Sequence, residues 1–524
     1  MRADSLTPTT QNFSSSPTRP ARRGWLAAAL ATAFAFAGGM PAAAFAAPTE
    51  ISVWHAMDPA HRATFDELVQ RFNSQQQDVH VTATAYASVT QLAGAGETAV
   101  LAKKQPNLIE LSDTAVPEFV ARHNAIMPMS DLLKTYPVKD LNFFLPQTTN
   151  YLRDARGNLL ALPWMAEAPV YIYNRDLYKK AGLDPDVTPK TWREMQNHLV
   201  ALANVAESDC PYATSRESWI HLENTSALHN VPFASKNNGL ETNGVGAELQ
   251  INQLLHVRHL ALMMSWVRSR LFTFQSHGYE ADAKFISGEC AVLTTGTGSL
   301  GAIQQQAKFS YGVAPLPYYD EEAKNGSNPF VGGPAFWAMS GHPAAEQKAL
   351  ATFIAFLATP VTAAEWHQKT GFLPLSDAAF RASSVSYYPS LHGSQAVIRA
   401  LSQTPAQYTR GFRLHNYNAV SDIMDQELDN IFSGRKPPKL GLDDAVARGN
   451  AVMRAPGAPA GGAGVGSKPA AAPRPGVKPA APAKPAAAKP AAPAKPAAAK
   501  PAAAPAKPAA KPAAAPAKPA PAKP

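Results

Sequence analysis

The residues best suited to hold a small ligand lie in one stretch, from Cys210 to Gly239. The stretch has neither the period of a strand nor that of a helix. It mixes aromatic side chains with hydrogen-bonding ones, among them Arg216, Trp219 and Lys236. Aromatic faces beside convergent donors and acceptors suit a pocket for a polar organic ligand. We therefore interpret the stretch as a pocket wall; the alternative is a helix–loop junction packed on the core.

Two glycine-containing turns can bring the backbone close to the same ligand. Gly296-Thr-Gly-Ser299 follows the buried apolar run 291–295 and opens a predicted helix. Free N–H groups at such a turn attract an anion, whereas the alternative is an ordinary helix cap at Ser299. The segment 330–334 is a second place where glycines allow close approach.

The amino-terminal part must position a third set of residues. Hydrophobic spacing predicts, in order, a strand, a helix, a strand, a helix and a buried strand over 50–54, 59–73, 78–86, 91–104 and 106–111. Such an order gives a parallel sheet, and ligands bind at the carboxyl ends of its strands. These ends fall at Trp54-His55, at 86–89 and at Ser112-Asp113.

The amino terminus carries an export signal. Arg22-Arg23 precedes an apolar run and the small-residue site Ala44-Phe45-Ala46, so we expect a signal peptide over 1–46, cleaved near Ala46. The general secretory route and the twin-arginine route both remain open. No other segment is apolar enough to span a membrane.

The carboxyl terminus, 454–524, is rich in Ala, Pro and Lys and cannot form a core. From 468 onward it carries ten lysines, Arg474 and no acid. The net charge of the whole chain is +9, so the basic charge comes from the two ends and gives no reason to expect nucleic-acid binding. This disordered tail is either solvated, a spacer, or a tether to an anionic envelope component.

Cys210 and Cys290 are the chain's two cysteines. Their spacing does not suit a zinc site, and they form either a disulfide or two buried thiols. We expect no metal and no cofactor.

Several longer motifs are shared with a known family. The segments are YNRDLYKKAGLDP (173–185), PKTW (189–192), ASKNNG (234–239), GECA (288–291) and EWHQKTGFLP (365–374). They resemble the extracytoplasmic solute-binding proteins of ABC importers, in the maltodextrin-type cluster, and in particular its glycerol-3-phosphate-binding branch. The resemblance covers roughly residues 50–453.

The resemblance implies a two-lobed α/β fold with three hinge crossings, near 162–166, 329–334 and 372–376. Lobe one would hold 47–163 and 334–373, and lobe two 164–331 and 374–453. The ligand would lie between the lobes, which close by hinge bending.

The function implied is a monomeric periplasmic protein that binds sn-glycerol 3-phosphate or glycerophosphodiesters and delivers them to an inner-membrane permease. A binder of another polyol or sugar is the alternative, and a structural envelope protein is a remote one. An enzyme is not expected, because no catalytic motif is present. Asp113 and Glu167 would be the carboxylate pair of a glycosidase, but the resemblance makes them binding groups.

Three site residues carry over from the family directly. Arg413 matches the phosphate-binding arginine of the family. A guanidinium group can bind two phosphate oxygens at once. Gly333 matches a glycine whose N–H contacts the ligand. Trp219 matches a tryptophan that covers the glycerol carbons.

Other site positions depart from the family. A tyrosine becomes Val89, a glutamate Asp113, a tyrosine Phe372 and a tryptophan Arg216, while two serines become Glu167 and Gly296. Thr297, beside Ser299, can replace the hydroxyl lost at Gly296. Glu167 would repel a phosphate unless its charge is paired. Arg216 can either pair with Glu167 or take over part of phosphate binding. A lost tryptophan would widen the pocket for a headgroup such as choline, for which Glu167 is a suitable acid.

Overall fold

The structure is a computed structural model that describes residues 47–112, 125–139, 141, 143, 152–153, 156–275, 277–401 and 406–454. The expected signal peptide, the tail beyond 454 and Asp113 lie outside these ranges. Within them, no single helix is long and apolar enough to cross a membrane. The pair 344–357 and 360–370 passes that test only when its two helices are taken together, across a bend of 66°.

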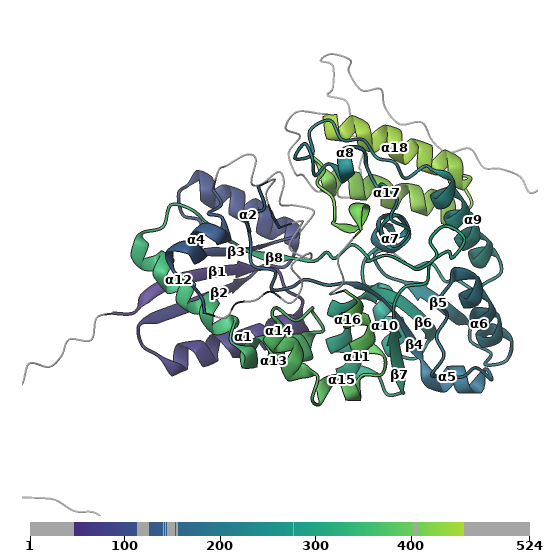
Figure 1. Cartoon of the computed structure of the whole chain (residues 1–524), viewed down its shortest axis with the longest axis horizontal. Helices are drawn as coiled ribbons and strands as arrows, with labels where there is room; N and C mark the ends of the chain where they lie inside the picture. The colour runs from purple at the N-terminus through teal and green to yellow at the C-terminus, as the bar shows by residue number, and fades with distance from the viewer. Residues whose placement is uncertain are drawn as a thin grey trace, which may run out of the picture. The chain divides into compact units, whose positions relative to one another are not determined.

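The first sheet joins four strands in the order β2-β1-β3-β8. They are β1 (Thr49–His55), β2 (Val79–Ala85), β3 (Leu108–Leu111) and β8 (Ala335–Ala338). β1 runs parallel to β2 and β3, which confirms the predicted parallel unit, and β8 returns antiparallel to β3. The helices around this sheet in Figure 1 are α1 (Pro59–Gln75), α2 (Val89–Leu101), α4 (Met129–Thr135), α12 (Ala344–Leu357), α13 (Pro360–Thr370) and α14 (Asp377–Ser383).

Helix α1 shows how sequence places a site residue. Asp58 precedes the helix, and its carboxylate accepts hydrogen bonds from the N–H groups of Ala60 and His61. Phe65 and Phe72 recur on one face and are buried, and burial of each such side chain stabilises the fold by about 1.5–3 kcal/mol. The helix start, with Asp58 and His61, is thereby fixed just beyond the carboxyl end of β1.

The second sheet has the order β5-β6-β4-β7. Its strands are β4 (Pro169–Asn174), β5 (Cys210–Thr214), β6 (Cys290–Gly296) and β7 (Tyr311–Ala314). β4 runs antiparallel to β6 and β7, and β5 runs parallel to β6. Every residue of β4, β5 and β6 is buried, as expected of a sheet covered on both faces.

The helices that follow these strands come mostly from the middle and end of the chain. The α-helices are α5 (Arg175–Lys180), α6 (Trp192–Asn204), α7 (Asn224–Leu228), α8 (Ser235–Asn238), α9 (Leu254–Arg268), α10 (Glu280–Ile286), α11 (Leu300–Gln306), α15 (Tyr387–Ser390), α16 (Ser394–Ala400), α17 (Tyr417–Phe432) and α18 (Pro438–Arg454). Three short turns of other kinds are the π-helix η1 (Trp219–Glu223) and the 3₁₀-helices η2 (Thr297–Ser299) and η3 (Gln407–Thr409).

Each sheet has its own apolar core, which gives the two-lobed α/β fold that we expected. The first core draws on 51–165 and 335–379, and the others on 166–330 and 373–453. The chain changes core within a few residues, because Phe372 and Leu375 belong to the first and Leu373 to the third. Helix α14 packs on α13, and its Ala379 belongs to the first core, although the predicted boundary puts the residues from 374 onward in lobe two. The lobe boundaries given above stay a prediction.

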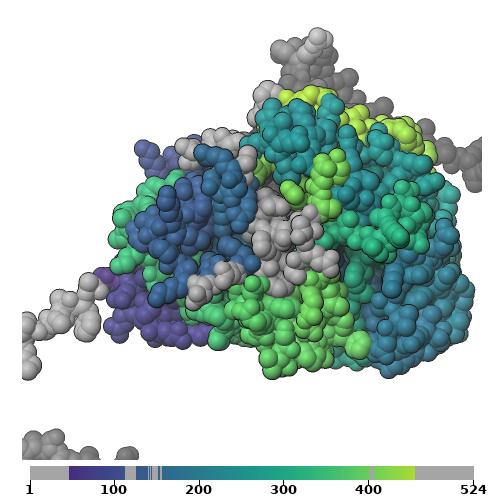
Figure 2. All heavy atoms as spheres, in the orientation of Figure 1, coloured from purple at the N-terminus to yellow at the C-terminus, as the bar shows by residue number. Residues whose placement is uncertain are grey.

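The chain after this change of core runs along the surface. Residues 377–401, green in both views, form one continuous stretch of surface (Figure 1, Figure 2). In the second sheet, Cys210 and Cys290 face each other from β5 and β6 with Cα atoms 4.5 Å apart, and they form a disulfide. Of the two alternatives for the cysteines, the structure therefore has the bonded one.

Candidate ligand-binding site

A cavity of about 960 Å³ is lined by residues of both lobes and of the segments that join them. This volume is typical of a small-molecule site. Much of its lining is apolar, and its ionisable side chains are Asp58, His61, Glu110, Glu167, Arg216, Tyr279, Asp282 and Lys308. Carboxylates therefore outnumber bases along the wall.

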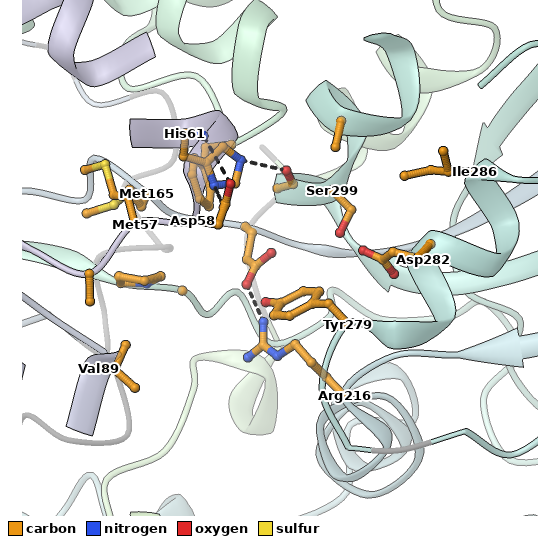
Figure 3. Close-up of a pocket in the computed structure, with 18 of the residues that line it drawn as sticks. Met57, Asp58, His61, Val89, Met165, Arg216, Tyr279, Asp282, Ile286 and Ser299 are labelled. Atoms are coloured by element: carbon orange, nitrogen blue, oxygen red, sulfur yellow. Dashed lines mark hydrogen bonds and ion pairs between the residues drawn. The ribbon is translucent and has the colours of Figure 1, made fainter. Parts of the chain in front are cut away.

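The closest charged contact in the cavity joins Glu167 to Arg216 (Figure 3). Glu167 lies just before β4, where its backbone exchanges hydrogen bonds of 2.9 and 3.0 Å with Gly332. Arg216 follows β5 with a φ of 54°, and its guanidinium lies 4.0 Å from the centroid of the Trp219 ring. The arginine is thus fixed between an acid and an aromatic face.

Three glycines leave the space that the Glu167 carboxylate fills. A Cβ atom added at Gly296 would overlap Glu167 Oε2, and one added at Gly298 would lie 3.1 Å from the same oxygen. At Gly333 it would lie 3.2 Å from Glu167 Cγ. The buried carboxylate therefore has a fitted place in the wall.

His61 connects the two lobes on the other side of the cavity (Figure 3). Its Nε2 lies 3.0 Å from the carbonyl oxygen of Gly298, its Nδ1 pairs with Asp58, and its ring lies 4.6 Å from that of Phe372. Burial lowers the pKa of His61, but the bond and the charge of Asp58 outweigh this and raise it above its usual value. The imidazolium form is therefore favoured at this position.

Two more carboxyls of the wall are held by hydrogen bonds. Glu110 accepts one from the N–H of Ala56 at 3.0 Å, and burial raises its pKa to about 7. Asp282 accepts one from the Ser215 hydroxyl at 2.7 Å, and burial raises its pKa as well. Tyr279 is half-exposed and extends its ring toward the Glu167–Arg216 pair (Figure 3). Such a wall offers acceptors to hydroxyl groups or to a cation.

Six of the residues predicted from the sequence line this cavity: Val89, Glu167, Arg216, Ser299, Gly333 and Phe372. Trp219 lies under Arg216 and is buried. Gly296 is behind Glu167, and Thr297 holds that turn by exchanging bonds of 2.8 and 3.2 Å with the backbone of Ala168. Ser299 makes no side-chain cap on α11, and its hydroxyl lies 3.1 Å from that of Thr295.

Arg413 lies apart from these residues. Its guanidinium donates to Asn243 Oδ1 at 2.7 Å and to the carbonyl oxygen of Arg153, and it is not among the lining residues. Its backbone N–H donates to Asn238 O at 2.8 Å. The ASKNNG end of the stretch 210–239 thus supports the Arg413 segment, whereas the Arg216 end forms cavity wall.

Sequence reasoning did not pick out Asp58, His61, Glu110, Tyr279 or Asp282. A weak indication existed for two of them, because Asp58-Pro-Ala-His61 is a helix-capping pattern just past a predicted strand end. Glu110 lies inside a strand, where nothing in the sequence distinguishes a site residue from a core one. Within the described residues, no group of three or more His, Cys, Asp or Glu side chains is arranged to hold a metal ion.

Comparisons with known proteins give a family for the chain. The sequence pattern of the family described as "Bacterial extracellular solute-binding protein" matches residues 67–392. The sn-glycerol-3-phosphate-binding periplasmic protein UgpB of Pectobacterium atrosepticum is 37% identical over 432 residues, which cover 82% of this chain and 95% of the relative. UgpB of Escherichia coli K12 is 36% identical over 435 residues, which cover 82% and 97%.

Solved structures agree on the fold. UgpB from Mycobacterium tuberculosis in complex with glycerophosphocholine matches with a TM-score of 0.60 and 19% identity, over 78% of this chain and 99% of that one. The cyclic alpha-maltosyl-1,6-maltose binding protein from Arthrobacter globiformis also has a TM-score of 0.60, with 20% identity over 78% and 99%. At these identities the likeness is one of fold.

Proposed function

Since the chain belongs to the family of bacterial extracellular solute-binding proteins, we propose that it captures sn-glycerol 3-phosphate or a glycerophosphodiester between its two lobes. The UgpB relatives that match this chain over most of their length are named for binding sn-glycerol 3-phosphate, and this supports the ligand class. The observation that carries the proposal in the structure is the Arg216 guanidinium in the cavity wall, since arginine matches the oxygens of a phosphate.

The proposal extends to where and how the protein works. It acts as a monomer in the periplasm after removal of residues 1–46, and it delivers its ligand to the membrane permease of an ABC importer. It releases the ligand chemically unchanged. Family membership, the apolar run before Ala46 and the cavity lined by both lobes support this role.

Calorimetry on the purified mature chain tests the ligand class. We expect one site per chain for sn-glycerol 3-phosphate, glycerophosphocholine or both, and recovery of the ligand intact by NMR after incubation. Absence of heat and of thermal protection with both ligands would refute the ligand class. Turnover of either ligand would refute the binding role.

A second candidate is a neutral sugar or polyol. The observation that favours it is the excess of carboxylates on the cavity wall, since these accept hydrogen bonds from hydroxyl groups. Maltose and glycerol in the same calorimetric series distinguish the two. Binding of maltose with no response to either phosphate ester would replace the first candidate by the second.

A further inference from the structure

The ion pair between Glu167 and Arg216 limits which phosphate esters the cavity can hold, an inference that rests on the proposed function. The Glu167 side chain is only 3% exposed, and that of Arg216 is 20% exposed. A ligand phosphate that takes over Arg216 removes the partner of a buried carboxylate. Leaving one charge of a buried pair without its partner is strongly unfavourable.

A zwitterionic ligand avoids this cost. Its phosphodiester takes the place of Glu167 beside Arg216, while its ammonium group takes the place of Arg216 beside Glu167. Both buried charges then keep a partner of opposite sign. Glycerol 3-phosphate carries close to two negative charges at neutral pH and has no cation to give to Glu167.

We propose that the Glu167–Arg216 pair makes the cavity selective for glycerophosphodiesters of cationic alcohols, such as choline or ethanolamine, over glycerol 3-phosphate. Glu167 binds the ammonium group and Arg216 the phosphodiester. Glu167 is then a specificity-determining residue, and the ligand class is set by charge matching at two neighbouring side chains.

The surroundings of the pair support a cation at this place. Asp58, Glu110 and Asp282 line the same cavity and provide further oxygens that an ammonium group can approach. The half-exposed Tyr279 ring offers an aromatic face to an ammonium group.

The packing around Glu167 shows that its carboxylate is a fitted part of the wall. Gly296, Gly298 and Gly333 each lie where a side chain would reach the Glu167 side chain. Gly296 has a φ of −84°, which alanine adopts without strain. A methyl group at Gly296 would therefore displace the Glu167 carboxylate while the backbone stays as it is.

Three ligands test the proposal on the mature chain by calorimetry: glycerophosphocholine, glycerophosphoglycerol and sn-glycerol 3-phosphate. Glycerophosphoglycerol is the control for size, because it is a phosphodiester without a cation. We expect glycerophosphocholine to bind at least 10-fold more tightly than either of the others. Equal affinity for the two diesters, or tighter binding of glycerol 3-phosphate, would overturn the proposal.

Two variants ask whether Glu167 is responsible. Glu167→Gln keeps the shape and removes the charge, and Gly296→Ala moves the carboxylate. Both should lower the affinity ratio of glycerophosphocholine to glycerophosphoglycerol to near one. The matched control is Glu427→Gln, which alters a buried carboxylate paired with Lys436 and Arg448 that is not part of the cavity wall. That control should keep the wild-type ratio.

The outcomes separate this inference from the proposed function. If the diesters bind and Glu167→Gln leaves their ratio at the wild-type value, charge matching at Glu167 is wrong and the ligand class stands. If none of the three esters binds the wild-type chain, the ligand class itself fails, and the inference with it.

Discussion

At the scale of single residues, two arginines are candidates for binding a phosphate, and the structure places them differently. Arg413 was predicted to bind phosphate by its position in the family pattern, and the structure places its guanidinium on Asn243 and on the backbone of Arg153. Arg216 lines the cavity in an ion pair with Glu167. The sequence raised that pairing as one of two possibilities, because nothing in it gives the distance between side chains 49 positions apart.

The role of Arg413 is tested by Arg413→Ala. The family pattern predicts that binding of phosphate-bearing ligands is lost with the fold intact, whereas the position of the guanidinium on Asn243 and Arg153, outside the cavity wall, predicts an unchanged affinity. Calorimetry measures the binding, and circular dichroism the fold. Arg410→Ala, at a nearby exposed arginine, is the control and should bind normally. An unchanged affinity in Arg413→Ala would remove this residue from the site.

At the scale of elements, α13 and the turn η2 meet closely at Gly371. Gly371 ends α13 and has a φ of 86° directly after the helix. A Cβ atom here would overlap the carbonyl oxygen of Thr297 and lie 2.8 Å from Leu300 Cβ. The lobe-one helix thereby rests against the lobe-two segment that carries Gly298 and Ser299.

Gly371→Ala should therefore lower the free energy of unfolding by more than backbone strain alone would. A left-handed conformation costs a non-glycine residue about 1–2 kcal/mol, and the overlap with Thr297 adds to this. Gly182→Ala is the matched control, because Gly182 has a φ of 74° and nothing within 4 Å of its Cβ position. Urea unfolding should show a loss of about 1 kcal/mol for the control and a clearly larger one for Gly371→Ala. Equal losses would contradict the close contact.

Regular elements were the most predictable part of the fold. Helix α1 covers the predicted helix 59–73 and extends to Gln75, and β6 contains the predicted run 291–295. The π-helix η1 and the left-handed residues Lys236, Asn237 and Asn238 were not predicted. Their conformations depend on contacts far along the chain, such as the bond from Asn238 Nδ2 to Gly411 O, and these have no local pattern.

At the scale of the whole molecule, several histidines are buried in the two cores. Burial lowers the pKa of His221 to about 3 and those of His256 and His367 to about 4, and it lowers that of His259 as well. In the unfolded chain each would titrate near 6.5. These rings are neutral in the folded chain, whereas they bind protons in the unfolded chain below about pH 6.5. The free energy of unfolding is therefore highest above about pH 6.5 and decreases as the pH falls.

Acid should therefore unfold the protein readily. Averaged between pH 6.5 and 5.5, the unfolded chain binds about three more protons than the folded chain at these four histidines, because a group with a pKa near 6.5 is half protonated at the upper pH and mostly protonated at the lower. Glu110 and Asp425 offset about one of them, since burial raises their pKa values to about 7 and about 6, and the second is only about half protonated in this range. A difference of about two protons corresponds to a loss of roughly 2–3 kcal/mol per pH unit. Urea unfolding at the two pH values measures this loss.

One variant attributes that slope to a residue. His256→Gln removes one buried ring while keeping a partner for the Ser226 hydroxyl. It should lower the proton uptake on unfolding by about one, and so reduce the loss of unfolding free energy per pH unit. His80→Gln, at an exposed histidine, should leave the slope unchanged. Equal or greater stability at pH 5.5 than at pH 6.5 in the wild-type chain would contradict the role of the buried histidines.

The disulfide between Cys210 and Cys290 connects the cavity to the maturation of the protein. The two cysteines are 80 positions apart, and the segment between them includes Arg216, Trp219, Tyr279 and Asp282, so one covalent bond encloses much of the lobe-two wall. Such bonds form in oxidising compartments. The pairing of β5 with β6 already brings the two cysteines together, so a chain that folds before it meets an oxidant can still close the bond. The binding site can then fold in one compartment, and the disulfide can form afterwards in an oxidising one.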